Sequence, residues 1–218
     1  MPFQSDAVSP VLLDVLHRLS STPVLEAFYL VGGTALALQI GHRRSIDIDL
    51  FTHAPFDAQM ISDSIARSQH ATEIDVSKNT VRCFIDGVKV DILAHQYPLI
   101  EPLSVVDGIR IASLQDITAM KLNAVANRGA KKDFWDIAVL LSRFSLDEML
   151  TFYGRKYRSG NRWAVLKSLT YFQDADAHDI PIHDLTGITW DQVKHTIQQA
   201  CAHFPTSSYT PAEPPAPR

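Results

Sequence analysis

The chain carries the run Val31-Gly32-Gly33-Thr34-Ala35 and, after a short gap, the run Arg44-Ser45-Ile46-Asp47-Ile48-Asp49-Leu50-Phe51. The apolar residues 28–31 predict a buried strand, and the two glycines that follow predict a sharp turn. Residues 34–40 predict a short helix that ends at Gly41. We therefore expect a strand, a glycine turn, a helix and a second strand in succession.

The second run alternates apolar and acidic residues, which is typical of a half-buried strand. Side chains two positions apart on a strand project to the same face, so Asp47 and Asp49 should stand side by side, with Ser45 in the same row. The opposite face, which we expect to enter the core, carries Ile46, Ile48 and Leu50. A solvated strand face without a function is the alternative explanation of the two carboxylates.

The glycine turn and the carboxylate pair together favour phosphate chemistry. Free N–H groups at the helix start attract an anion, and Gly32 and Gly33 let the backbone approach it closely. The Thr34 hydroxyl would either contact that phosphate or only cap the helix. Adjacent carboxylates repel each other, and magnesium (or manganese) commonly binds one or two carboxylates plus substrate phosphates. The combination indicates metal-assisted phosphoryl or nucleotidyl transfer, whereas the glycines alone could be purely structural.

These features resemble the nucleotidyltransferase superfamily, whose signature is Gly-Gly or Gly-Ser, about a dozen residues, then Asp-x-Asp. Within it, the chain is similar to the AbiEii/AbiGii toxin family, which includes the MenT toxins. The matching segments are LVGGTALALQIGHRRSIDIDLF, VKVDILAH, ASLQDITAMKLNAVANRGAKKDFWDIAVLL and YFQDADAHDIPIHDLTGITWDQVK. The resemblance implies an α+β fold: a nucleotidyltransferase-type mixed β-sheet flanked by helices, followed by a helical C-terminal half.

The resemblance also implies that Asp47, Asp49 and Asp91 bind the metal. Asp91 lies in the strand-like run 88–94, where the family's third carboxylate helps to hold the metal and acts as a base on the attacking hydroxyl. From the pattern alone, Asp91 joins the pair only if its strand neighbours theirs. An exposed strand carboxylate with Lys89 as its partner is the alternative.

Three further site residues take their roles from the family motifs. Lys121 matches a functional helix lysine that would neutralise the nucleotide phosphates, and Asp133 matches an active-site acid that would fix Lys121 or the acceptor. Ser45 resembles a serine that would bond a phosphate or be modified, and a strand serine with no role is equally compatible. A solvated helix face would explain Lys121 alone, and favourable charge at a helix start would explain Asp133. Asp136 is interpreted as a structural partner.

Composition limits the surroundings of this site. With 218 residues, 46% of them hydrophobic, the chain can form one ordinary domain or two small ones. A formal net charge of −4 means that a nucleic acid would need a local basic patch. The candidates for that patch are His42, Arg43, Arg44, Arg128, Lys131 and Lys132. Two distant cysteines, no signal-peptide pattern and no apolar run of roughly 18 residues favour a cytoplasmic protein without membrane association.

The remaining pattern changes from strands to helices near residue 110. Before it, helices are expected at 11–19 and 58–68, and strands at 71–76, 81–85, 88–94 and, at the sheet edge, 109–112. After it, helices are expected at 113–128, 131–144, 146–157, 163–172 and 190–204. We therefore predict a catalytic core in 1–110, a helical half in 111–204 that completes the active-site cleft, and a disordered tail in 205–218.

The resulting functional hypothesis is a nucleotidyltransferase that moves a nucleoside monophosphate from a nucleoside triphosphate to an acceptor hydroxyl. The resemblance implies a toxin of a type IV-like toxin–antitoxin (abortive infection) system, an RNA such as a tRNA 3′ end as acceptor, and a separate antitoxin as partner. The alternatives are a nucleotidyltransferase acting on a small molecule or a protein, and a non-catalytic nucleotide-binding module.

Overall fold

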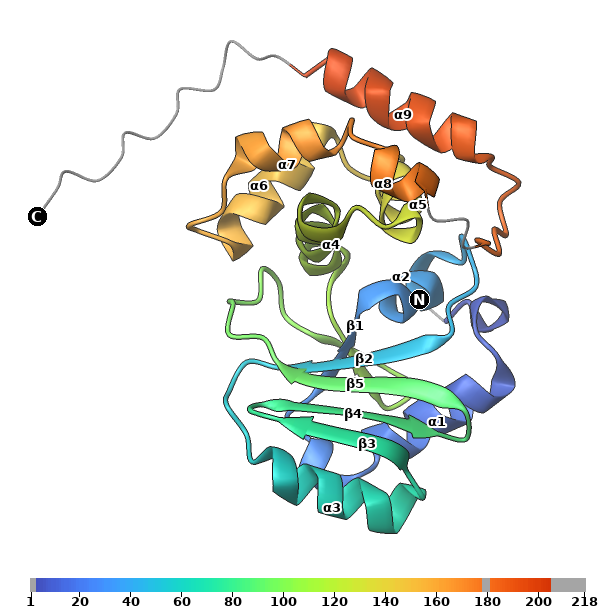
Figure 1. The fold of residues 1–218 in the computed structure, drawn as a ribbon, viewed down its shortest axis with the longest axis vertical. Helices are drawn as coiled ribbons and strands as arrows, with labels where there is room; N and C mark the ends of the chain where they lie inside the picture. Colours follow the sequence, from blue (N-terminus) through green and yellow to red (C-terminus); the bar gives the residue numbers. More distant parts are fainter. Residues whose placement is uncertain (1–2, 178–180, 205–218) are drawn as a thin grey trace, which may run out of the picture.

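The computed structural model describes residues 3–177 and 181–204. In these residues, seven strands form one mixed sheet in the order β3-β4-β5-β2-β1-β7-β6 (Figure 1). The strands are β1 Tyr29–Val31, β2 Asp47–Thr52, β3 Thr72–Ser77, β4 Thr80–Ile85, β5 Val88–Ala94, β6 Ser104–Val106 and β7 Ile109–Ile111. The predicted mixed sheet is confirmed.

The centre of the sheet brings the predicted carboxylates together. Strand β2 pairs antiparallel with β1 and parallel with β5. In the β2–β5 register, Asp49 lies opposite Asp91, and Asp47 lies opposite Lys89. The condition that the Asp91 strand neighbours the strand of Asp47 and Asp49 is therefore met.

Helices cover both faces of the sheet and form a separate layer beyond it. Helices α1 and α3 pack on the side away from the C-terminal helices, and α2 lies between the sheet and those helices (Figure 1). The helices are α1 Pro10–Ser20, α2 Gly32–Ile40, α3 Ala58–Gln69, α4 Leu114–Arg128, α5 Lys131–Leu140, α6 Leu146–Lys156, α7 Arg162–Ser168, α8 Gln173–Ala177 and α9 Trp190–Ala202. Two short 3-10 helices, η1 Ser5–Ala7 and η2 Pro23–Leu25, complete the described elements.

One hydrophobic cluster connects these layers. It contains Leu16 of α1, Val90 of β5, Phe134 of α5 and Ile197 of α9, all completely buried. The sheet and the helical layer therefore share a core, which fixes the space between them. No helix in residues 3–177 and 181–204 is long and apolar enough to cross a membrane.

The structure differs from the sequence prediction at several elements. Strand β7 pairs with both β1 and β6, so it is not the edge strand, and β6 was not predicted at all. Helix α5 ends at Leu140 instead of residue 144, α7 ends at Ser168 instead of residue 172, and the short helix α8 was not predicted. The last strand ends at Ile111 and α4 begins at Leu114, while the functional division at residue 110 remains a prediction. The predicted tail 205–218 lies outside the described residues.

Ile46 does not enter the core as predicted. Its side chain is 74% exposed, whereas Ile48 and Leu50 are buried. Because β2 begins at Asp47, Ile46 lies in the preceding loop, where the alternation of a strand does not apply.

Candidate active site

The glycine turn packs directly against the sheet carboxylates. Gly32 opens α2 with φ of +72°, and a Cβ atom at this position would collide with the Asp49 carboxylate. A Cβ atom on Gly33 would lie 2.6 Å from Nη2 of Arg43. The first turn of α2 can therefore approach Asp49 and Arg43 this closely only because both residues are glycines.

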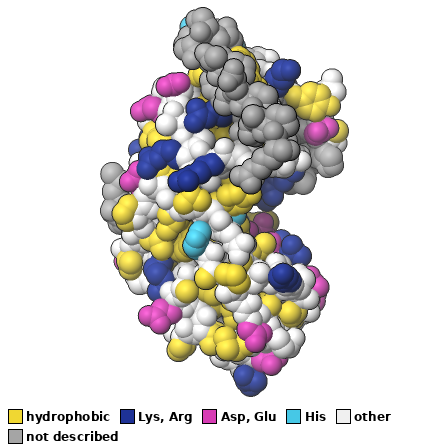
Figure 2. Space-filling view, turned by 90° about the vertical axis from the view of Figure 1, so that its left-hand side faces the viewer, with side chains coloured by type: hydrophobic (Ala, Val, Ile, Leu, Met, Phe, Trp, Pro, Cys, Tyr) yellow, Lys and Arg dark blue, Asp and Glu magenta, His cyan; other side chains and the backbone are white. Residues whose placement is uncertain are grey.

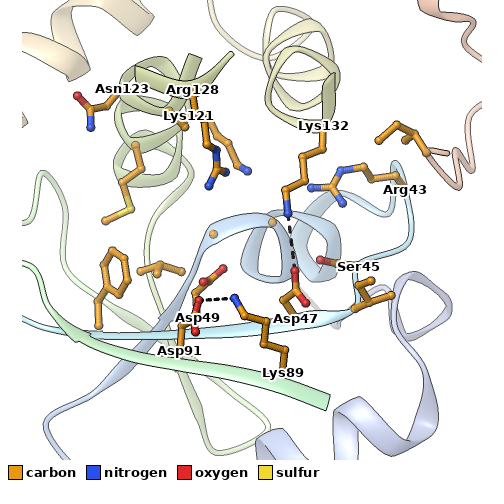
Figure 3. Close-up of a pocket in the computed structure, with 18 of the residues that line it drawn as sticks. Arg43, Ser45, Asp47, Asp49, Lys89, Asp91, Lys121, Asn123, Arg128 and Lys132 are labelled. Carbon is orange, nitrogen blue, oxygen red and sulfur yellow. Dashed lines mark hydrogen bonds and ion pairs between the residues drawn. The ribbon is translucent and has the colours of Figure 1, made fainter. Parts of the chain in front are cut away.

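The three predicted carboxylates line one cavity above β2 and β5 (Figure 3). Lys89 Nζ lies 2.7 Å from Asp91 Oδ2, and Lys132 Nζ lies 3.7 Å from Asp47 Oδ2. Burial raises the pKa of Asp49, and the carboxylates of Asp91 and Asp47 raise it further, against the lowering effect of Lys121. The sheet therefore holds a concentration of negative charge that two flexible lysines neutralise only in part.

These carboxylates fit a divalent cation as donors but do not form a complete cage. Among the described residues, no group of three His, Cys, Asp or Glu side chains is arranged so that it could hold a metal ion by itself. Magnesium normally takes only one or two carboxylates and completes its shell with water and substrate phosphates. The observation that supports this donor set is that Oδ1 of Asp91 is buried and has no hydrogen-bond partner among the described residues, since a bound cation would satisfy such an oxygen.

A buried ionic network lies between α4 and α5. Lys121 Nζ is 3.0 Å from Asp133 Oδ1 and 2.6 Å from Asp136 Oδ2. Arg128 donates to both oxygens of Asp133 from Nε and Nη2, at 2.7 and 3.0 Å. Burial alone would lower the pKa of Lys121, but the carboxylates of Asp136 and Asp133 outweigh it and the pKa is raised. Lys121 is therefore a fixed cation at the cavity wall.

Asp136 extends this network to the loop before β2. It accepts hydrogen bonds from Nε and Nη2 of Arg43 at 2.7 and 2.9 Å, and its Oδ1 lies 2.7 Å from Nε2 of His42. Burial would raise the pKa of Asp136, but Lys121 and Arg43, with the hydrogen bonds from His42 and Arg43, hold it well below its ordinary value. Asp136 is thus a structural partner, as interpreted from the sequence, and it positions both Lys121 and Arg43.

Asp133, Thr34 and Ser45 lie behind or beside the cavity surface. Asp133 is completely buried under Lys121 and Arg128, which matches the predicted role of fixing Lys121. The Thr34 hydroxyl is also completely buried; it donates to the Asp47 carbonyl, and its oxygen lies 2.8 Å from Ser45 Oγ. Ser45 contributes to the cavity lining. Thr34 therefore does not cap α2, whose start has no side-chain cap, and its buried hydroxyl links α2 to Ser45 and Asp47 instead of facing the cavity.

The cavity has a volume of about 500 Å³ and lies between the sheet and the helical layer. Figure 2 shows the molecule hollowed at mid-height, between these two parts. Basic residues in its lining are Arg43, Arg44, Lys89, Lys121, Arg128 and Lys132, and the acidic ones are Asp47, Asp49 and Asp91. The volume is typical of sites for small ligands of nucleotide size. Four members of the predicted basic patch face it, whereas His42 is buried and Lys131 lies 5.5 Å from the Trp190 ring.

Comparison with known proteins identifies the family. The model of the nucleotidyl transferase AbiEii toxin family, of type IV toxin–antitoxin systems, matches residues 14–199. The chain belongs to this family. It is 39% identical over 168 residues to an uncharacterized protein of Aquifex aeolicus, covering 74% of this chain and 82% of that one.

Two solved structures have the same fold. The nucleotidyltransferase toxin MenT4 of Mycobacterium tuberculosis superposes with a TM-score of 0.59 at 14% identity, covering 90% of this chain and 84% of MenT4. JHP933 of Helicobacter pylori superposes with a TM-score of 0.53 at 17% identity, covering 88% of each chain. This chain is therefore a nucleotidyltransferase of the AbiEii toxin family.

Several lining residues of this AbiEii-family enzyme carry no local sequence signal. The segment 181–183 reaches the cavity because Arg44 N donates to the His183 carbonyl at 2.8 Å and Leu185 N donates to the His42 carbonyl at 2.9 Å. The family-matching segment YFQDADAHDIPIHDLTGITWDQVK contains these residues but does not indicate their contact with the loop before β2. A second group of lining residues was not predicted because its members come from β2, from α4 and from the ends of β5 and α6, which only the fold brings together: Phe51, His95, Met120, Asn123 and Tyr157.

Proposed function

We propose that this enzyme transfers a nucleoside monophosphate from a nucleoside triphosphate to an acceptor hydroxyl on RNA, with a tRNA 3′ end as the favoured acceptor. One observation carries the proposal: the glycine turn at the start of α2 packs against Asp49, opposite Asp91 on the neighbouring strand. Phosphate-binding N–H groups and the carboxylates are thereby held at one place. Membership of a type IV toxin family supports a toxic role countered by a separate antitoxin protein.

The triphosphate would lie along the start of α2. The N–H groups of Gly32 and Gly33 are free for an anion because the helix start has no side-chain cap. Lys132 and Arg128 are the more exposed cations beside this turn, and Lys121 is held in the wall by its two carboxylates. Positive charge is thus fixed where negative charge develops on the leaving pyrophosphate.

Asp47 and Asp49, with Asp91, would hold magnesium or manganese together with the substrate phosphates. When bound, the metal supplies charge neutralisation at the reacting phosphate. Lys89 now pairs with Asp91 at 2.7 Å, and its side chain is long and partly exposed. Lys89 would move away from Asp91 when the substrates are bound, and the Asp91 carboxylate would then be free to contact the metal and the acceptor hydroxyl.

The protein then has to move one proton. The acceptor oxygen forms a bond to the α-phosphorus as the bond between that phosphorus and the oxygen bridging to the β-phosphate breaks. Pyrophosphate leaves with the electron pair, and the hydroxyl proton passes to the Asp91 carboxylate as general base. Asp91 is suited to this role because it faces Asp49 across the two strands.

Label transfer tests this proposal directly. The enzyme is incubated with magnesium and total RNA, with each nucleoside triphosphate labelled in turn at the α- or the γ-phosphate. We expect α-label, but not γ-label, to enter a defined RNA band. Asp47→Asn should reduce transfer by more than about 100-fold, since it removes the negative charge of a proposed metal ligand, whereas loss of a group that only supports a ligand typically costs about 10- to 100-fold. The matched control is Asp14→Asn on α1, whose exposed carboxylate pairs at the surface with Arg18.

Each alternative outcome has a distinct meaning. Entry of γ-label would identify a phosphotransferase and overturn the proposal. Label on a small molecule or on the enzyme itself would refute the RNA acceptor while keeping nucleotidyl transfer. Nucleotide binding that persists unchanged without magnesium and in Asp47→Asn, with no transfer, would identify a non-catalytic binding module.

A further inference from the structure

The cavity has two chemically different ends. Arg43, Ser45 and Lys132 lie at one end, whereas Asn123 lies at the other, with the carboxylates between them (Figure 3). The lining residues that carry no formal charge and offer ring or thioether surface are Phe51, His95, Met120 and Tyr157. The basic end suits phosphates, and the proposed function leaves this aromatic group unexplained.

The aromatic group forms a continuous, supported surface. The rings of Phe51 and His95 are stacked at 5.0 Å between centroids with an interplanar angle of 26°. Tyr157 meets His95 edge-on at 6.0 Å, and its hydroxyl lies 3.3 Å from His95 Nε2. Tyr97 packs on Tyr157 at 4.6 Å. Burial, with the charge of Lys156, lowers the pKa of His95 to about 4, so the surface is uncharged at neutral pH.

Strand geometry fixes the distance between this surface and the carboxylates. Phe51 follows Asp49 by two residues on β2, so it occupies the same row one repeat further on, at roughly 7 Å. Both residues line the cavity. A nucleotide whose phosphates lie at the glycine turn would therefore extend its sugar and base along the row of Asp47, Asp49 and Phe51.

Helix α4 supplies the facing wall. Met120, Asn123, Ala124 and Asn127 are spaced by three, four and seven residues, and all four line the cavity. The Asn127 amide donates to the Asn123 carbonyl at 2.7 Å. Among the described residues, the Asn123 side chain has no hydrogen-bond partner, so its amide offers one acceptor and two donors to a ligand.

We propose that the surface of Phe51, His95 and Tyr157 binds a nucleobase by stacking, with Met120 on the facing wall, and that Asn123 contacts the edge of that base. This inference rests on the proposed function and adds a base-recognition site to it. The base belongs to the nucleoside triphosphate or to the terminal nucleotide of the acceptor, and both share this chemistry. Aromatic stacking accepts any base, so discrimination between bases comes from the Asn123 amide.

Equilibrium binding to the full-length enzyme separates base recognition from phosphate recognition. The four nucleoside triphosphates and inorganic tripolyphosphate, each with magnesium, are compared on wild type, Phe51→Ala and Phe51→Tyr. We expect Phe51→Ala to weaken binding of the preferred triphosphate by about 5- to 150-fold and to leave tripolyphosphate binding unchanged. Phe51→Tyr keeps the ring and should retain binding. Tyr171→Ala, which removes a 50% exposed aromatic side chain outside the cavity, is the matched control.

Asn123→Ala provides a second, independent variant because its side chain makes no contact on which folding depends. We expect it to reduce the preference among the four triphosphates by about 5-fold or more. If triphosphate binding is unchanged in Phe51→Ala while the KM for RNA rises, the stacked base belongs to the acceptor. If Phe51→Ala and Asn123→Ala change neither triphosphate binding nor the KM for RNA, the inference is overturned and nucleotidyl transfer stands. If wild type binds neither triphosphate nor tripolyphosphate, the proposed function itself fails.

Discussion

At the scale of single residues, Gly32 is the position at which the site tolerates a side chain least. Its φ of +72° disfavours any side chain, and a Cβ atom would collide with the Asp49 carboxylate. We therefore expect Gly32→Ala to displace Asp49 and reduce nucleotidyl transfer by about 100-fold. Gly108→Ala is the matched control, because Gly108 has φ of +78° but nothing within 4 Å of a Cβ atom.

The two glycine variants should share the backbone penalty and differ in activity. Each substitution places a side chain at positive φ, which costs about 1–2 kcal/mol of stability. Urea unfolding measures that shared cost, and initial rates of label transfer measure the difference. Equal activity of the two variants would show that close packing of Gly32 on Asp49 does not matter for the reaction.

The carboxylates of the cavity were predictable because strand alternation and the family motifs named them. Asp47, Asp49 and Asp91 fall on adjacent strands, and that adjacency follows once the strands are paired. Ile46 was misplaced because the start of β2 is set by tertiary pairing, which periodicity does not reveal. Phe51 was assigned only to a strand, since a single aromatic residue carries no pattern of its own.

At the scale of elements, the N-terminal part of α5 organises the cavity wall. Asp133 and Asp136 are one turn apart and hold Lys121 of α4, while Asp136 also holds Arg43. Helix α5 therefore fixes α4 and the loop before β2 relative to each other. Removing the charge of Asp136 should leave the buried cations Lys121 and Arg43 without their shared carboxylate. An unbalanced buried charge strongly destabilises a fold.

The depressed pKa of Asp136 predicts a specific pH dependence of stability. A carboxylate whose folded pKa lies below its unfolded value of about 3.9 stabilises the protein above that value and loses this contribution as pH falls. The raised pKa of Lys121 has the opposite sign, so its contribution is present below about 10.4 and lost above it. The network should thus stabilise the fold fully from about pH 5 to pH 10.

Asp136→Asn tests this expectation. We predict a loss of about 3–5 kcal/mol in the free energy of unfolding at pH 7 and a shallower loss between pH 5 and pH 2 than in wild type. Some acid sensitivity should remain, since Asp133 also has a lowered pKa. Urea unfolding at a series of pH values gives both quantities, with Asp14→Asn as the surface control. Parallel acid limbs in wild type and Asp136→Asn would contradict this account.

The elements themselves were mostly predictable, and the errors have identifiable causes. Ser113 marked the start of α4, and its Oγ accepts a hydrogen bond from Asp116 N as a helix cap. Strand β6 was missed because it has only three residues, although Asp107-Gly108 at positive φ forms a turn that resembles the predicted one at Asp86-Gly87. The order of β7 between β1 and β6 depends on long-range pairing, which no local pattern encodes.

At the scale of the whole molecule, the charge is unevenly distributed. The net formal charge is −4, yet the cavity lining has six basic side chains against three acidic ones. The basic members are Arg43, Arg44, Lys89, Lys121, Arg128 and Lys132, and the acidic ones are Asp47, Asp49 and Asp91. An RNA acceptor should therefore be attracted to the cavity while the rest of the surface repels it.

Arg44 is the cation best placed to test this distribution by RNA binding. It is exposed at the cavity rim, in contrast to Arg43, whose donors are occupied by Asp136. Each phosphate contact of a single strand contributes about 0.7 to the slope of log affinity against log salt concentration. We expect RNA affinity to fall steeply with salt and Arg44→Gln to reduce the magnitude of the slope by about 0.7.

Arg67→Gln is the matched control, because it changes the net charge by the same amount. Arg67 is exposed on α3, a helix that lies across the sheet from the cavity, so its substitution should leave the slope unchanged (Figure 1). Equal effects of the two variants would assign the salt dependence to net charge instead of to the cavity, and a slope near zero in wild type would exclude phosphate contacts at this site.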